Sequence, residues 1–229
     1  MYRKEYKRKV DVNQVKLLDS RLFAGLSEAE LTELMQTVNP PSRKFKRGAT
    51  IWREGDAIDG VGVIETGALF YQRFHSDGKV QLVRLFIPGE IINVEAAVSL
   101  RRTSPTHVIA AADGNYIWFS NAKLFKNPEV PAETVRVLQA NLLAYLADGA
   151  IRFIKKSDIL SRRTVRDRVI IYLNILREQY GNEVDIGMNQ EELAQYLCVD
   201  RSSLSEELNK MRRDGLIDFN RKHFRLFFD

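Results

Sequence analysis

The stretch from Asn189 to Ile217 constrains the fold most strongly, because its apolar residues predict two short helices joined by a turn of three or four residues. Ala194 is a small residue at the position where two such helices would cross. The apolar positions are Leu193, Ala194 and Leu197 in the first helix and Leu204, Leu208 and Met211 in the second. We therefore predict a helix-turn-helix whose second helix leaves its outer face exposed.

The residues on both sides of this motif complete a small domain over residues 158–229. Before the motif, Thr164 to Leu176 has the spacing of an amphipathic helix that ends near Gly181. After it, Leu216 to Phe219 and Phe224 to Phe227 alternate like two strands around a turn. A small helical unit closed by a β-hairpin is the outline of a winged helix.

The outer face of the second helix carries side chains that could read DNA. Arg201 is at its N-terminal end, from which an arginine can bond O6 and N7 of guanine together. Asp200 or Ser202 could cap the start of this helix. The other candidates on the face are Ser202, Ser205, Glu206 and Lys210, and those for phosphate contacts are Asn189, Gln190, Arg212, Arg221 and Lys222. The alternative is a solvated surface, since residues 189–229 hold seven Lys or Arg against eight Asp or Glu.

Residues 45–119 are typical of short strands separated by glycine turns. Gly67, Gly78 and Gly89 recur at intervals of eleven residues, a spacing that predicts an all-β roll or barrel. The predicted strands are Ala49–Trp52, Gly62–Glu65, Leu69–Phe74, Val80–Phe86, Thr106–Ala111 and Tyr116–Phe119. Short helices within residues 13–37, with Ser27 and Glu30 as a capping box, are expected to pack on this roll. We assign the chain to the α+β class, with a jelly-roll-like domain over residues 17–130.

A long helix is predicted over residues 131–157, with apolar residues at alternating intervals of three and four. These residues are Val135, Leu138, Leu142, Tyr145, Leu146, Gly149 and Phe153. The helix could lie on its own domain, or it could pair with a second copy of the chain. We favour a dimerisation helix, because Thr134 to Ile154 covers about six turns at ~3.6 residues per turn. A hinge is expected to begin at Lys155.

Composition limits the other possibilities. A single cysteine, Cys198, excludes a disulfide framework and an iron-sulfur cluster and fits a reducing, cytoplasmic compartment. We expect this thiol to be buried in the turn between the motif helices, although a redox-sensitive thiol there could switch DNA binding. No signal peptide and no apolar stretch of membrane-spanning length is apparent. The net charge of +5 lies mostly in a basic tail, residues 1–16, so it says little about DNA.

Together these features resemble the Crp/Fnr family of bacterial transcription regulators from about Leu17 to Arg225. The stretches that carry the resemblance are Glu191–Ala194, Val199–Ser205 and Gly215–Ile217 near the C-terminus and Glu54–Asp56, Glu65–Ala68 and Pro88–Glu90 in the roll. The resemblance implies a sequence-specific homodimer on a pseudo-palindromic promoter site, with RNA polymerase as the partner of an activator. In the family an Arg, a Glu or Ser and a second Arg read the half-site. Arg201 and Ser202 match the first two, whereas Glu206 replaces the second Arg and could accept from cytosine N4 or face solvent.

The resemblance also implies a small-molecule effector in the roll. Members that bind cyclic AMP hold its ribose with a Gly-Glu pair and its phosphate with an Arg followed by Ser or Thr. This chain has Ile92–Glu95 and Ser104–Thr106 at those places, so we expect an unknown effector other than cyclic AMP. By analogy, the candidate effector-binding residues are Arg84, Glu95, Thr106 and Tyr145. His75 and His107 lack paired ligand spacing, so we expect no haem, and no metal site or other cofactor is identified.

Two other functions stay open at this point. A roll of this kind could be a cupin-like metal enzyme, but the three histidines are scattered and no nucleotide-binding loop appears. The chain could also be a ligand-sensing regulatory protein that acts through protein partners. Arg201 discriminates between these readings, because replacing a base-reading arginine by Ala should relax specificity at one base position.

Overall fold

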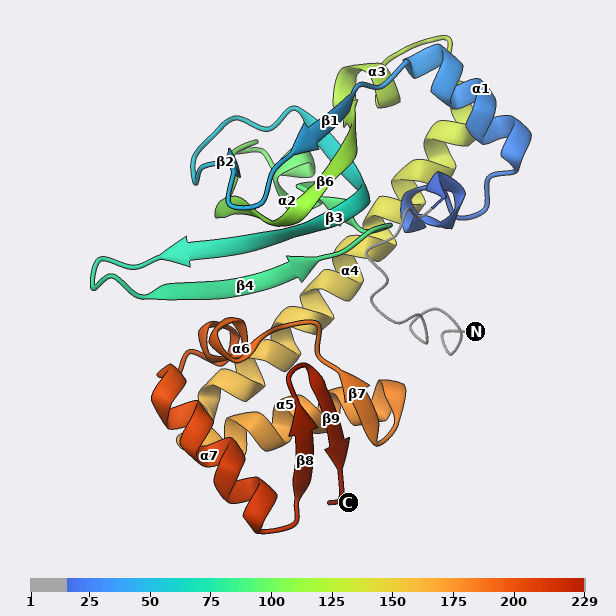
Figure 1. The fold of residues 1–229 in the computed structure, drawn as a ribbon. Coiled ribbons are helices and arrows are strands. Elements are labelled where there is room, and N and C mark those ends of the chain that lie inside the picture. The colour runs from blue at the N-terminus through green and yellow to red at the C-terminus, as the bar shows by residue number, and fades with distance from the viewer. Residues whose placement is uncertain (1–15, 229) are drawn as a thin grey trace. The chain divides into compact units, whose positions relative to one another are not determined.

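The computed structural model describes residues 16–228, so the predicted basic tail 1–16 lies outside the described residues except for Lys16. The chain divides near residue 150 into two compact units. Strands dominate the first unit and helices dominate the second, which confirms the predicted α+β class (Figure 1).

The first unit is built on a six-stranded sheet, in which the main path of neighbouring strands is β1-β6-β3-β4. β2 pairs with β6 and β5 pairs with β3, and both pairings are antiparallel. The strands are β1 (Ser42–Phe45), β2 (Thr50–Trp52), β3 (Gly60–Phe74), β4 (Val80–Phe86), β5 (Ile91–Ile92) and β6 (His107–Ser120). The predicted N-terminal β-rich domain is therefore confirmed.

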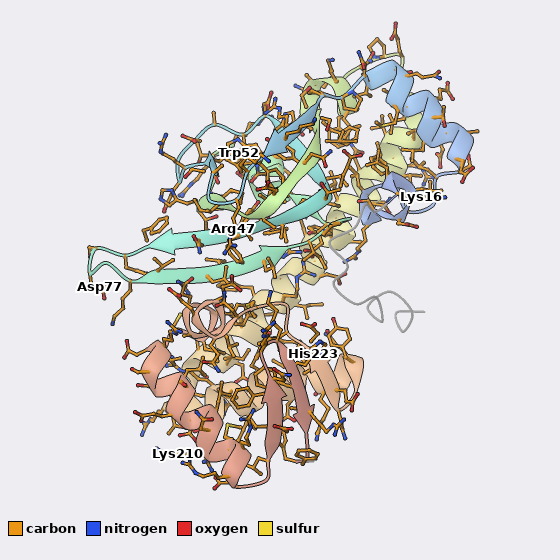
Figure 2. The ribbon with its side chains drawn as sticks, viewed as in Figure 1. Lys16, Arg47, Trp52, Asp77, Lys210 and His223 are labelled. Carbon is orange, nitrogen blue, oxygen red and sulfur yellow. The ribbon has the colours of Figure 1, made fainter. Side chains whose placement is uncertain are left out.

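β3 and β6 are longer than predicted, because each joins two of the expected short strands. The register between them shifts around Gly67, whose φ is +79°. A Cβ at this position would lie 2.4 Å from the carbonyl oxygen of Asp113, so only glycine fits. The glycine expected to end a strand thus forms an irregularity within one strand. Gly78, by contrast, lies in the loop between β3 and β4, close to Asp77 at its tip (Figure 2).

Short helices pack on this sheet. The capping box predicted at Ser27 and Glu30 is confirmed, since Glu30 N donates to Ser27 Oγ and Ser27 N donates to Glu30 Oε2 at 2.8 Å. The helices are the 3-10 turns η1 (Leu17–Asp19) and η2 (Arg21–Phe23), followed by α1 (Glu28–Val38), α2 (Val94–Val98) and α3 (Asn121–Phe125). Phe23 and Phe119 meet edge to face inside the core at 5.5 Å between ring centroids. Burying side chains of this size stabilises the unit by about 1.5–3 kcal/mol each.

The long helix α4 (Ala132–Ser161) corrects the prediction of which residues form the dimer contact. Leu138, Leu142 and Tyr145 lie in the core of the first unit, and Val135 and Leu146 pack against that core. Spacing by three and four identifies an apolar stripe but not the surface that covers it, and here the chain's own roll covers it. Of the remaining two predicted contacts, Gly149 is half-buried and Phe153 is exposed.

α4 also continues past the predicted hinge. Lys155 lies inside the helix. The break between α4 and the next helix falls at residues 162–164, and Thr164 at its end caps the next helix. No proline or glycine near Lys155 interrupts the backbone hydrogen bonds, which explains the longer helix. By length and composition α4 is long and apolar enough to cross a membrane, which is weak evidence for a single helix, and three of its residues lie in the roll core.

The second unit has the predicted winged-helix outline. Its sheet has the strand order β7-β9-β8, with antiparallel pairing throughout. β8 and β9 form the expected hairpin, and β7 was not predicted. The elements after α4 are α5 (Val165–Tyr180), β7 (Glu183–Asp185), α6 (Gln190–Leu197), α7 (Arg201–Arg213), β8 (Ile217–Asn220) and β9 (His223–Leu226).

Candidate nucleic-acid interface

α6 and α7 form the predicted helix-turn-helix, and all six of its predicted apolar residues are buried. The start of α6 is closed by Asn189, whose Oδ1 accepts hydrogen bonds from the backbone N–H groups of Glu191 and Glu192. Glu192 Oε2 accepts from Asn189 N at 2.7 Å and completes a capping box. α7 begins after Asp200 without a side-chain cap, so the capping predicted from Asp200 or Ser202 is not formed.

The turn between the two helices is held by a side chain from α5. Arg168 Nη1 donates to the carbonyl oxygens of Leu197 at 3.0 Å and Cys198 at 2.9 Å. Its Nε donates to the carbonyl oxygen of Arg162 at 2.9 Å. The guanidinium therefore satisfies carbonyls at the C-terminal end of α6, where the helix dipole favours a cation.

Cys198 occupies the left-handed conformation that ends α6, with a φ of +53°. Its thiol is exposed, which corrects the expectation of a buried residue. The physical reason is its position: the residue that closes the helix lies outside the apolar faces of both α6 and α7.

A second arginine of α5 fixes the orientation of α7. Arg166 Nε donates to Glu207 Oε1 at 2.5 Å, and its Nη2 donates to Asp214 Oδ2 at 2.7 Å. The hydrogen bonds to Glu207 and Asp214 raise the pKa of the Arg166 guanidinium. Sequence reasoning missed both Arg166 and Arg168. The sequence did hold a signal for them, which is their position near the start of α5. A cation there opposes the helix dipole, so an acidic or carbonyl partner elsewhere in the chain is expected.

The outer face of α7 is free, as predicted. Arg201, Ser202 and Glu206 are exposed, and Ser205 is half-buried. Within residues 16–228 neither Arg201 nor Glu206 has an ion-pair partner. Arg201 therefore keeps all its guanidinium donors for another molecule.

The predicted phosphate contacts divide into two groups. Three of them already have internal bonds: Asn189 caps α6, Lys222 Nζ donates to the carbonyl oxygen of Gly187 at 2.9 Å, and Arg212 pairs with Asp218 at 3.1 Å. Gln190, Lys210 and Arg221 have no side-chain partner among residues 16–228. Lys210 lies on α7 and His223 on the wing (Figure 2). The exposed Arg213, also without an ion-pair partner there, is a cation that the sequence reasoning did not select.

In the first unit, the structure brings two of the predicted effector residues together. Arg84 Nη2 lies 2.7 Å from the hydroxyl of Tyr145, and the same atom donates to Glu90 Oε1 at 2.6 Å. Burial alone would lower the pKa of the Arg84 guanidinium, but Glu90, Tyr145 and Glu95 together outweigh burial and raise that pKa. Glu90 was not predicted as a site residue, although it belongs to the quoted Pro88–Glu90 turn.

The other two predicted effector residues differ from each other in burial. Glu95 is exposed on α2, and its charge acts on Arg84 and on the buried Tyr71. Thr106 is buried, and its Oγ1 has no hydrogen-bond partner among the described residues. Asn93, which was not predicted, is also buried: its Oδ1 accepts from the Tyr71 hydroxyl, while its Nδ2 lacks a partner there.

These residues do not fit a cyclic nucleotide. Residues 104–106 contain no cation, and Ser104 Oγ is bonded to the carbonyl oxygen of Thr106 at 2.8 Å. Arg73 Nη2 donates to the carbonyl oxygen of Pro105 at 3.3 Å, but Arg73 is an exposed residue near the end of β3. A phosphate buried beside this segment would lack the charge-assisted bonds that offset its desolvation.

Two family models match the chain. Residues 42–126 match the cyclic nucleotide-binding domain, and residues 167–227 match the Crp-like helix-turn-helix domain. The first match covers most of the roll and the second covers most of the unit that contains α5–β9.

Curated relatives and a solved structure agree with these matches. The transcriptional activator protein FnrL of Cereibacter sphaeroides is 28% identical over 76% of this chain and 71% of its own length. The transcriptional regulatory protein btr of Bordetella pertussis is 23% identical over 88% and 83%. The global regulator CLP of Xanthomonas campestris, described as responsive to c-di-GMP, has the same fold, with a TM-score of 0.71, 15% identity and coverage of 89% of this chain and 100% of its own. The relatives are transcription regulators and not enzymes, which argues against a cupin-like enzyme.

Proposed function

Because the chain belongs to the Crp/Fnr family of transcription regulators, we propose that it binds a two-fold symmetric DNA site as a homodimer, with one α7 in each half-site. The observation that carries this proposal is the exposed Arg201 at the start of α7, which has no ion-pair partner among the described residues. From the N-terminal end of a helix in the major groove, an arginine reaches a base edge and bonds guanine O6 and N7 together.

We assign the remaining DNA contacts to side chains of the motif and the wing. Ser202, Ser205 and Glu206 lie along the same helix as Arg201, and we assign them to the base edges or to water between them. Gln190, Lys210, Arg213 and Arg221 have no internal partner within residues 16–228, so we assign them to phosphates. We propose that the side chains of Asn189, Arg212 and Lys222 stabilise the motif and the wing. Their backbone atoms can still approach the duplex.

For the homodimer we propose a different face of α4 from the one predicted. The apolar side chains of α4 that the roll leaves uncovered are Leu143 (70% exposed), Ile151 (53%), Phe153 (70%) and Ile154 (66%). Large apolar groups that recur along a helix and remain in water are typical of an interface with a partner. Of the seven predicted contacts, Phe153 alone belongs to this set.

We propose that the effector of the regulator acts in the roll, at the polar group that contains Arg84 and Tyr145, with Glu95 nearby. We include Thr106 because it is buried and its Oγ1 has no hydrogen-bond partner among the described residues. As a DNA-binding regulator the protein would work in the cytoplasm, and RNA polymerase is its partner if it activates.

Selection of DNA from a random library by the purified full-length protein tests the proposal. No ligand is added, and the salt concentration is near physiological. We expect an enriched palindrome whose half-site centres lie about one helical turn, ~34 Å, apart. Enrichment of a single, non-repeated element would contradict the homodimer. No enrichment, with or without added cell metabolites, would contradict sequence-specific DNA binding.

A further inference from the structure

We propose that the carboxylate of Glu90 is a built-in counter-ion for Arg84, so that the roll takes no anionic ligand at this arginine. The inference deepens the proposed function, because it concerns the effector group of the same regulator. The proposal limits the effector to molecules that bind without placing a negative charge on the Arg84 guanidinium.

Both oxygens of the Glu90 carboxylate are already engaged. Oε1 accepts from Arg84 Nη2 at 2.6 Å, and Oε2 accepts from the backbone N–H of Ile87 at 3.0 Å. The side chains of Arg84 and Glu90 are only 17% and 19% exposed, so water screens the pair weakly. One carboxylate thus receives a cation and a backbone donor, the two kinds of partner that a bound anion would seek.

Two aromatic rings also lie close to the Arg84 guanidinium. Its central carbon lies 4.1 Å from the ring centroid of Phe86 and 5.3 Å from that of Tyr145. The Tyr145 hydroxyl is bonded to Arg84 and donates to the carbonyl oxygen of Ile91 at 2.9 Å. An entering phosphate would have to displace Glu90 and leave a nearly buried carboxylate without its cation, which is strongly unfavourable.

The same group ties α4 to the roll without any ligand. The Tyr145 ring also lies near Arg21, whose guanidinium carbon is 5.4 Å from the ring centroid. Arg21 in turn pairs with Asp148 of α4 at 2.5 Å. Two cations and two carboxylates therefore alternate around Tyr145, and they join η2, β4, the Glu90 turn and α4. The charges of these four side chains balance, and the exposed Glu95 adds a further negative charge that acts on Arg84.

Removing the carboxylate and supplying it again from solution tests the proposal. The variant Glu90→Ala deletes the anion and leaves room for acetate. Asp113→Ala is the matched control, because Asp113 likewise accepts from a cation, Lys46 at 2.8 Å, and from a backbone N–H, that of Arg47 at 2.8 Å, but is exposed. Thermal unfolding of the full-length proteins is followed with acetate, with inorganic phosphate and with cyclic AMP, each against chloride at equal ionic strength.

We expect Glu90→Ala to lower the melting temperature by about 6 °C or more, and acetate to restore a measurable part of that loss. Asp113→Ala and the wild type should not respond to acetate. Neither phosphate nor cyclic AMP should give the wild type a saturable rise in melting temperature beyond the linear rise that phosphate causes by exclusion from protein surfaces. A saturable rise of the wild type with phosphate or cyclic AMP, or a Glu90→Ala protein that ignores acetate, would overturn the proposal.

A second variant covers the case in which Glu90→Ala does not fold. Glu90→Gln keeps the volume of the side chain and removes its charge, so it should melt below the wild type, and an unchanged melting temperature would overturn the proposal. No DNA is present in these measurements, so a failure of the proposed DNA binding would leave their result intact.

Discussion

Arg168 and Cys198 are thirty positions apart in the sequence, yet Arg168 Nη1 donates to the carbonyl oxygen of Cys198 at 2.9 Å. This bond connects α5 to the turn that sets the start of α7, and Arg201 is the first residue of α7. The placement of Arg201, which we propose reads a base, therefore depends on a residue that does not itself have to touch DNA.

Arg168→Ala removes three hydrogen bonds to carbonyl oxygens at once. We expect it to destabilise the unit by about 1–3 kcal/mol, because carbonyl groups in the turn lose a charged partner. Denaturant unfolding measures this loss. Arg163→Ala is the control, since Arg163 is exposed and has no ion-pair partner within residues 16–228. Equal free energies of unfolding for the two variants would show that the hydrogen bonds of Arg168 to the turn contribute nothing to stability.

Arg201→Ala should weaken binding to the selected DNA site by about 1–3 kcal/mol and relax the preference at one base pair in each half-site. Arg201→Lys should recover part of the affinity, since lysine can bond guanine but lacks the planar fork. Competition binding with every base substituted at each position measures both effects. An equal loss on all sequences would make Arg201 a phosphate contact instead.

Lys210→Ala should weaken binding to every DNA sequence alike, because a phosphate contact carries no sequence information. We expect the slope of log K against log salt concentration to fall in magnitude by roughly one. Affinities measured across a salt series give this slope. An unchanged slope would place Lys210 away from the DNA backbone.

Leu142 and Leu143 are neighbours on α4 with opposite surroundings, since Leu142 is 3% exposed and Leu143 is 70% exposed. Leu142→Ala should destabilise the roll by about 2–5 kcal/mol, because it leaves a cavity in the core. Leu143→Ala should leave the unfolding of the monomer unchanged but weaken the dimer by roughly tenfold or more. Sedimentation equilibrium measures dimer dissociation. A dimer weakened by Leu142→Ala but not by Leu143→Ala would support the dimer contact that the sequence predicts through Leu138, Leu142 and Tyr145.

The pH dependence of stability should report on Tyr71. Burial raises the pKa of its phenol well above the usual value. Between pH ~10 and that raised pKa, the unfolded chain has lost the proton and the folded chain has kept it, so stability is complete below pH ~10 and falls as pH rises further.

The variant Tyr71→Phe should make this alkaline decline in stability less steep. It should also cost about 1–3 kcal/mol at neutral pH, because Asn93 loses the partner of its Oδ1 and backbone N–H. Unfolding between pH 7 and 11.5 measures both, and a decline as steep as that of the wild type would exclude Tyr71 as a source.

Features that depend on nearby residues were predictable. The capping box at Ser27 and Glu30 and the apolar faces of α6 and α7 lie where the sequence placed them, because a cap or a helical face involves residues three or four positions apart. The joining of short strands into β3 and β6 was not predictable in this way. A glycine with positive φ ends a strand in one context and forms an irregularity within a strand in another, and the partner strand decides which.

The fold class, the helix-turn-helix and the exposed position of Arg201 follow from the order of the amino acids, because periodicity and capping act within one or two turns of chain. In contrast, tertiary packing selects the stripe of α4 that the roll covers, the carboxylate that neutralises Arg84 and the carbonyls to which Arg168 donates. Arg84 meets Tyr145 across sixty-one positions, and Arg166 meets Glu207 across forty-one. Such pairs are selected when the core packs and excludes water, and no local pattern of residue types records that choice.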